Sequence, residues 1–111
     1  MIIDDEVKNV DLIQMLEEEK RARINNEPSK QGPLLVEIIK HFATKNDYEN
    51  IRSYLVSLSK KRNQSKNAMT EMITYALDIV YLNLSEEERI KLLNTIVEIT
   101  EGKIFVEVNF F

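Results

Sequence analysis

Apolar residues recur along this chain at the spacing of α-helices. The clearest case follows Pro33, where apolar side chains occur at i, i+1, i+4, i+5 and i+8 and would share one face of a helix. These residues are Leu34, Leu35, Ile38, Ile39 and Phe42. Proline is favoured in a first helical turn, because its missing N–H needs no partner there. The pattern therefore predicts a helix that begins near Pro33.

A further helix is predicted directly after Asp47, whose carboxylate can cap the first turn. Its one-sided apolar positions are Tyr48, Ile51, Tyr54, Leu55 and Leu58. The preceding helix is expected to end near Lys45-Asn46, so only a short connection separates the two. Helices joined in this way form an antiparallel hairpin, here over roughly 34–59.

A second hairpin is predicted over roughly 67–101. Ser85 and Glu88 have the spacing of a capping box, which would begin its last helix. Gly102 is expected to end that helix in the left-handed conformation. The first helix of this hairpin would bury Met69, Met72, Ile73, Ala76 and Val80, and the last would bury Ile90, Leu93, Ile96 and Val97.

The N-terminal part is more charged. A helix is predicted from about Val7 to Arg23, in which Glu19 and Arg23 have the spacing of an i,i+4 ion pair. Residues 25–33 contain both prolines and one of the two glycines, which predicts a loop. We therefore divide the chain into a charged helix and loop over 1–32, and two stacked hairpins with the segment that follows them over 33–111.

These elements define an all-α fold of about five helices. Neither hairpin could bury its apolar stripe alone, and stacking the two would bury both, as in helical-hairpin repeats of the α-solenoid or tetratricopeptide-like kind. A residue-level repeat signature is absent from the sequence. The segment 104–111 fits either a strand or a helix, and periodicity alone leaves both open.

Composition argues against catalytic and metal sites. The chain has no cysteine, which excludes disulfides, thiolate catalysis and cysteine-based zinc sites. His41 is the only histidine, and no ligating partner lies at helical spacing from it. Consecutive acids such as Glu86-Glu87-Glu88 point in different directions around a helix and cannot converge on one metal ion. We expect no enzyme activity, no catalytic residue, no cofactor and no metal.

Charge and hydropathy indicate the compartment and the partners. The N-terminus is acidic, and no apolar run approaches the roughly 20 residues of a membrane span, so we expect a cytoplasmic and nuclear protein without membrane contact. The net charge of −4 argues against a general nucleic-acid binder.

A basic segment, Lys60–Lys66, separates the two predicted hairpins. It can be a solvated turn, a docking surface for an acidic protein or a nucleic-acid contact. The last is disfavoured, because no aromatic residues that could stack on bases are interleaved with the cations. The candidate docking residues are Lys60, Lys61, Arg62 and Lys66.

Two stretches are more specific than helix formation requires, namely Leu58–Lys66 and Ile99–Val108. Together they resemble the family of non-ATPase regulatory subunit 12 of the 26S proteasome. In that family a Leu-Ser-Lys-Lys/Arg-x-x-Gln-x-Lys segment precedes a Thr-Glu-(Gly/Asn)-Lys-Ile-aromatic-Val-Glu segment. Leu16-Glu17-Glu18-Glu19-Lys20 also looks like part of the family's first helix, and the resemblance runs from about Leu12 to Val108.

The resemblance implies a non-catalytic scaffold of the proteasome lid, which would act in 26S assembly and ubiquitin-dependent degradation. Its partners would be other lid subunits, with the ATPase ring or the core particle as further candidates. The family continues into a PCI domain, so this chain would match only the N-terminal solenoid, as a truncated form. Alternatives are the matching subunit of the related signalosome, or a small RNA-associated helical protein that uses the basic segment.

In the family, the segment that corresponds to 104–111 begins a helix. The resemblance therefore favours helix over strand here. Such a helix would present an exposed apolar interface made of Ile104, Phe105, Val108 and Phe111.

Overall fold

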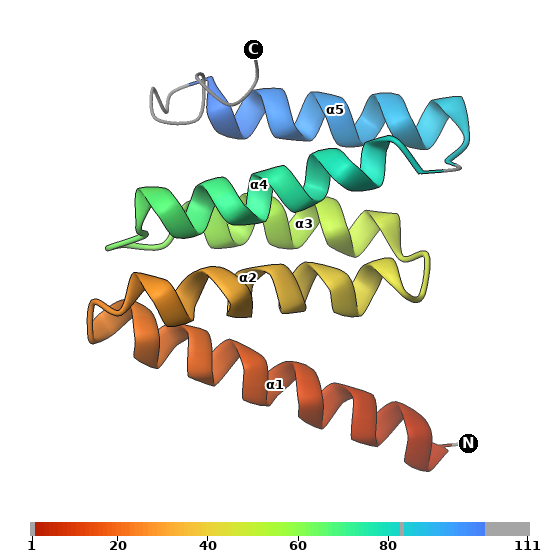
Figure 1. Cartoon of the computed structure of the whole chain (residues 1–111). Coiled ribbons are helices and arrows are strands. Elements are labelled where there is room, and N and C mark those ends of the chain that lie inside the picture. Colours follow the sequence, from red (N-terminus) through yellow and green to blue (C-terminus); the bar gives the residue numbers. More distant parts are fainter. Residues whose placement is uncertain (1, 83, 102–111) are drawn as a thin grey trace.

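A computed structural model describes the backbone of residues 2–82 and 84–101, and the side chains of residues 11–82 and 84–101. All regular secondary structure in these ranges is α-helical, which confirms the predicted all-α class. The helices in chain order are α1 (Ile2–Ile24), α2 (Pro28–Ala43), α3 (Tyr48–Ser59), α4 (Lys66–Val80) and α5 (Glu86–Thr100) (Figure 1). None of the helices in the described part of the chain is long and apolar enough to cross a membrane.

The helices form a stack with α1 and α5 at opposite ends (Figure 1). Consecutive helices pack as hairpins, and α2 also packs along α4 while α3 packs along α5. The predicted hairpins α2–α3 and α4–α5 are therefore stacked through equivalent helices. On its other side α2 packs against α1, so the charged N-terminal helix is part of the same stack.

One continuous hydrophobic core lies between the helices. Most of the predicted apolar positions of α2, α3 and α4 are fully buried in it, whereas Leu34, Tyr48 and Tyr54 are half-buried. Each large buried side chain contributes about 1.5–3 kcal/mol relative to exposure. The most completely buried apolar residues are Leu35, Ile38, Ile39, Ile51, Leu55, Leu58, Met69, Met72, Ile73, Leu92 and Ile96.

The loop predicted over residues 25–33 is wrong in its second half, because α2 begins at Pro28 and continues through Pro33. The real connection is short. Asn26 adopts a left-handed φ of 57°, the Glu27 N–H bonds the Ala22 carbonyl at 2.8 Å, and the Asn26 N–H bonds the Arg23 carbonyl at 3.2 Å. This is a Schellman turn with asparagine in the position that glycine usually takes. The residue 32/33 division proposed above thus falls within α2.

The buried face predicted for α5 is also wrong in part. Leu92, Ile96 and Ile99 are buried, whereas Ile90 and Val97 are 51% and 47% exposed. Both sets satisfy helical spacing, since apolar residues occur around much of α5. Packing against α3 and α4 selects the face that contains Leu92. The first helix is longer than predicted, since it begins at Ile2. The predicted end of α5 at Gly102 and the predicted helix over 104–111 both lie outside the described residues.

Candidate protein-docking site

The basic segment forms the connection between α3 and α4, and both of its ends are fixed by local bonds. Asn63 has a left-handed φ of 61°, which reverses the chain. The Ser65 hydroxyl accepts a hydrogen bond from the Ala68 N–H at 3.4 Å and caps α4. We call residues 60–65 the basic turn.

Gln64 anchors the basic turn to the rest of the molecule. Its Nε2 donates to the Leu58 carbonyl at 2.6 Å, an acceptor at the end of α3 that also receives the Lys61 N–H at 3.3 Å. Its Oε1 accepts from Gln31 Nε2, and the same Gln31 nitrogen donates to Glu19 Oε2 at 3.2 Å. The polar chain Glu19–Gln31–Gln64 therefore joins α1, α2 and the basic turn.

Burial makes this polar chain energetically important. Glu19 and Gln31 are each 1% exposed, and a buried carboxylate is costly unless it is paired and hydrogen-bonded. Arg23 supplies the positive charge, since its Nε lies 3.3 Å from Glu19 Oε2, which confirms the predicted i,i+4 pair. The contact is electrostatic, because this Nε has no aligned hydrogen-bond acceptor among the described residues.

The polar chain was not foreseen from the sequence. Glu19 occurs within a run of three glutamates, and such a run is usually solvated. The sequence pattern predicts a loop at Gln31, whereas this residue lies on the buried side of α2. A usable signal existed in Gln64, which belongs to the family pattern around the basic turn although it carries no charge.

The candidate docking residues are exposed. Lys60, Lys61 and Arg62 lie side by side in the turn, and none forms an ion pair with a described residue. Lys66 is set apart from them as the first residue of α4. The other candidate set, Ile104, Phe105, Val108 and Phe111, lies outside the described residues.

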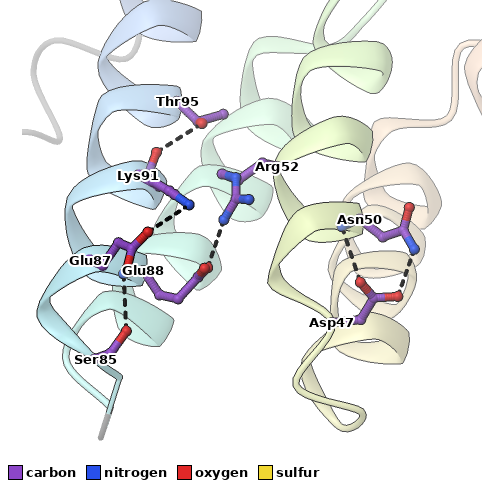
Figure 2. A network of polar contacts seen from close by, with 8 residues as sticks. All are labelled: Asp47, Asn50, Arg52, Ser85, Glu87, Glu88, Lys91 and Thr95. Atoms are coloured by element: carbon purple, nitrogen blue, oxygen red, sulfur yellow. Dashed lines mark hydrogen bonds and ion pairs between the residues drawn. The ribbon is translucent and has the colours of Figure 1, made fainter.

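A second polar cluster lies at the other side of the fold, between α3 and α5, and its role is structural (Figure 2). Arg52 Nη1 lies 2.8 Å from Glu88 Oε2 and links the two helices. As predicted, Asp47 caps α3 by accepting from the Asn50 N–H, and Ser85 caps α5 by accepting from the Glu88 N–H at 3.2 Å. The Glu88 carboxylate has found a partner on α3 that the capping-box pattern did not indicate.

The remaining titratable groups offer little chemistry. His41 is half-buried, with its ring edge-on to Phe42 and its Nε2 3.1 Å from Lys45 Nζ. Burial, followed by the negative charges of Glu37 and Asp78, raises the pKa of Tyr75. In the part of the chain that the structure describes, no group of three His, Cys, Asp or Glu residues could hold a metal ion.

A stack of helical hairpins of this kind defines an all-α protein of the α-solenoid type. Residues 11–110 match the family model described as PSMD12/CSN4, N-terminal, and the chain belongs to this family. This agrees with the resemblance drawn from the two sequence segments.

Similar proteins include proteasome regulatory subunits from plants and fungi. The chain is 32% identical to 26S proteasome non-ATPase regulatory subunit 12 homolog B of Arabidopsis thaliana over 85% of its own length and 21% of that protein's. It is 34% identical to 26S proteasome regulatory subunit RPN5 of Saccharomyces cerevisiae, over 90% of the chain and 23% of the relative. The chain thus spans about a fifth of the length of these relatives.

Proposed function

We propose that this chain is a non-catalytic scaffold of the 26S proteasome regulatory particle, corresponding to the N-terminal solenoid segment of a lid subunit. The observation that carries the proposal is the family membership, together with relatives that are named as proteasome regulatory subunits. The chain would take part in lid assembly, and through it in ubiquitin-dependent degradation. Its partners would be other lid subunits, in the cytoplasm and nucleus.

The basic turn is the proposed point of contact with an acidic partner surface. Lys60, Lys61 and Arg62 are exposed and have no ion-pair partner among the described residues, so their charges remain available to another molecule. Exposed charges contribute little to the stability of their own fold, so stabilisation of this chain does not explain three adjacent cations. Complementary charges across an interface favour association and select the partner.

Charge reversal tests this proposal. The tagged chain and the variant K60E/K61E/R62E would be expressed in cells and purified at low and high salt. We expect proteasome subunits to co-purify with the parent and to be lost with the variant. The interaction should weaken as salt rises, since exposed charges are screened over roughly 8–10 Å at physiological ionic strength. The control K40E/K45E/K91E makes the same change in net charge at exposed positions elsewhere and should behave like the parent.

Each outcome has a definite meaning. If the basic-turn variant co-purifies as well as the parent, the turn is only a solvated connection. If the parent itself brings down no proteasome subunit, the scaffold proposal is wrong. Recovery of salt-sensitive RNA in place of protein would instead assign the cations to nucleic-acid binding.

A second candidate is the signalosome, because the matching family model is described by both PSMD12 and CSN4. The same purification distinguishes the two complexes. Signalosome subunits in the parent sample, without proteasome subunits, would assign the chain to that complex.

A further inference from the structure

An apolar groove lies beside the basic turn, between α1 and the C-terminal end of α3. It has a volume of about 280 Å³. α1 packs against α2 and not against α3, which leaves the space between these two helices open in the described fold. The groove is lined by Ile13, Leu16, Glu17, Glu19, Lys20, Arg23, Leu58 and Lys61.

The floor of the groove is hydrophobic. Among its lining side chains Leu58 is buried, Leu16 is half-buried and Ile13 is 54% exposed. An isolated exposed isoleucine is ordinary, but three apolar side chains around one hollow make a surface that gains free energy when it is covered.

The polar chain described above fixes the distance between the two helices that form the walls of the groove. One end of that chain, Glu19, lines the α1 wall, and the other end is the carbonyl of Leu58 on the α3 wall. Gln31 and Gln64 bridge them. Two helices that do not pack against each other are thus fixed at a defined separation. A preformed groove loses less conformational entropy on binding than a mobile one.

The exposed rim is predominantly positive. Lys20 and Lys61 line it, and Lys60 and Arg62 flank Lys61 in the basic turn. Two carboxylates are also present: Glu19 is buried and already paired with Arg23, whereas Glu17 is exposed. The accessible charges therefore complement an acidic ligand.

We propose that this groove binds an acidic segment of a partner protein, with an apolar side chain inserted against Ile13, Leu16 and Leu58 and with carboxylates facing the lysines. This inference rests on the proposed docking function and adds to it the hydrophobic anchor that the basic turn alone lacks. Buried apolar anchors surrounded by a polar rim carry most of the affinity in protein interfaces. The apolar floor also favours a peptide over a phosphate backbone.

Defined peptides provide the probe. A fluorescein-labelled peptide with two leucines one helical turn apart among glutamates would be titrated with the 111-residue chain and followed by anisotropy. Two matched peptides carry lysine in place of glutamate, or serine in place of leucine. We expect the acidic leucine peptide to bind about tenfold more tightly than either, which corresponds to about 1.4 kcal/mol. In NMR spectra of the protein, the changes in backbone amide chemical shift on binding this peptide should centre on Ile13, Leu58 and Lys61.

Variants then separate anchor from charge. Ile13→Ser should weaken binding by about tenfold, which is a reasonable effect for losing one apolar anchor. Ile90→Ser is the matched control, because Ile90 is 51% exposed on α5 and should leave binding unchanged. Lys61→Glu should weaken binding and reduce its dependence on salt. Equal binding of all three peptides, or an unchanged affinity in Ile13→Ser, would overturn the proposal.

The two proposals can fail separately. In one outcome K60E/K61E/R62E no longer co-purifies with proteasome subunits, whereas Ile13→Ser does and the acidic peptide does not bind. The groove is then not a peptide-binding site, and the docking function of the basic turn stands. If the peptide binds as expected but the parent recovers no proteasome, the groove stands and the assigned complex is wrong. A dimer of the parent that Ile13→Ser abolishes would make a second copy the occupant and overturn the choice of partner.

Discussion

At the scale of single residues, Gln31 has the most consequential side chain outside the apolar core. Its Nε2 serves two acceptors at once, Glu19 Oε2 and Gln64 Oε1, and it is almost completely buried. A fully satisfied polar chain makes the surrounding structure specific, whereas a partly satisfied one is more costly than an apolar replacement. The position of the basic turn relative to α1 therefore depends on one amide group.

The substitution Gln31→Leu tests this dependence. It keeps the volume similar but leaves the Glu19 carboxylate and the Gln64 carbonyl without their donor, so the free energy of unfolding should fall by about 1–3 kcal/mol. Urea denaturation followed by circular dichroism would measure the change. Gln14→Leu is the control, since Gln14 is exposed and bonds only an exposed Glu18, and its effect should stay within about 0.5 kcal/mol. Equal effects would mean that the buried chain contributes no stability.

At the scale of helices, the sequence predicted the type of each element and the capping residues that begin two of them. Asp47 and Ser85 act as predicted caps, and the stripes of α2, α3 and α4 are largely buried. Their patterns are unambiguous because polar residues occupy the opposite faces. Capping residues and apolar spacing were enough to predict these helices, because each pattern allowed only one interpretation.

Where two interpretations of the pattern were available, the sequence could not decide. Prolines at 28 and 33 with a glycine between them suggested a loop, but Pro28 is at the first helical position and Asn26 ends α1 by itself. On α5, either Ile90 with Val97 or Leu92 with Ile96 could face inward. That choice depends on α3, and nothing in the α5 sequence identifies its neighbour. The groove between α1 and α3 likewise depends on how distant helices pack.

Arg52 and Glu88 provide the tertiary information that the α5 pattern lacks. Their side chains are 21% and 27% exposed, so the pair is partly shielded from water. A double-mutant cycle with Arg52→Ala and Glu88→Ala should give a coupling energy near 1 kcal/mol in urea denaturation. Lys91 and Glu87, 48% and 77% exposed within α5, form the matched control pair and should couple by only about 0.3–0.5 kcal/mol (Figure 2). The cycle would contradict this view if the two coupling energies were the same.

At the scale of the whole molecule, the stack has two different ends. The α1 end is charged, and the groove with its basic turn lies on that side. The α5 end exposes large apolar side chains, with Ile90 and Val97 on the helix and Tyr81 and Leu82, which are 83% and 58% exposed, in the turn before it. In a solenoid each layer contacts only its neighbours, and apolar side chains exposed on one layer can be buried by contact with another molecule.

The α5 end leads to the final prediction. The apolar set predicted for 104–111 follows α5 directly in sequence, and each large side chain would contribute about 1.5–3 kcal/mol on burial. Apolar surface that remains exposed promotes association. We therefore expect the 111-residue chain to self-associate in sedimentation velocity, and deletion of residues 104–111 to shift it toward monomer.

The deletion should leave the helices folded, because side chains between Leu35 and Ile99 form one continuous hydrophobic core. Circular dichroism and the urea midpoint would test this directly. The double variant I90K/V97K, which adds charge to the exposed face of α5 without shortening the chain, should reduce self-association as well and provides an independent check. If the deletion instead melts the protein, residues 104–111 pack into the core. That outcome would contradict the prediction that residues 104–111 form an exposed apolar interface.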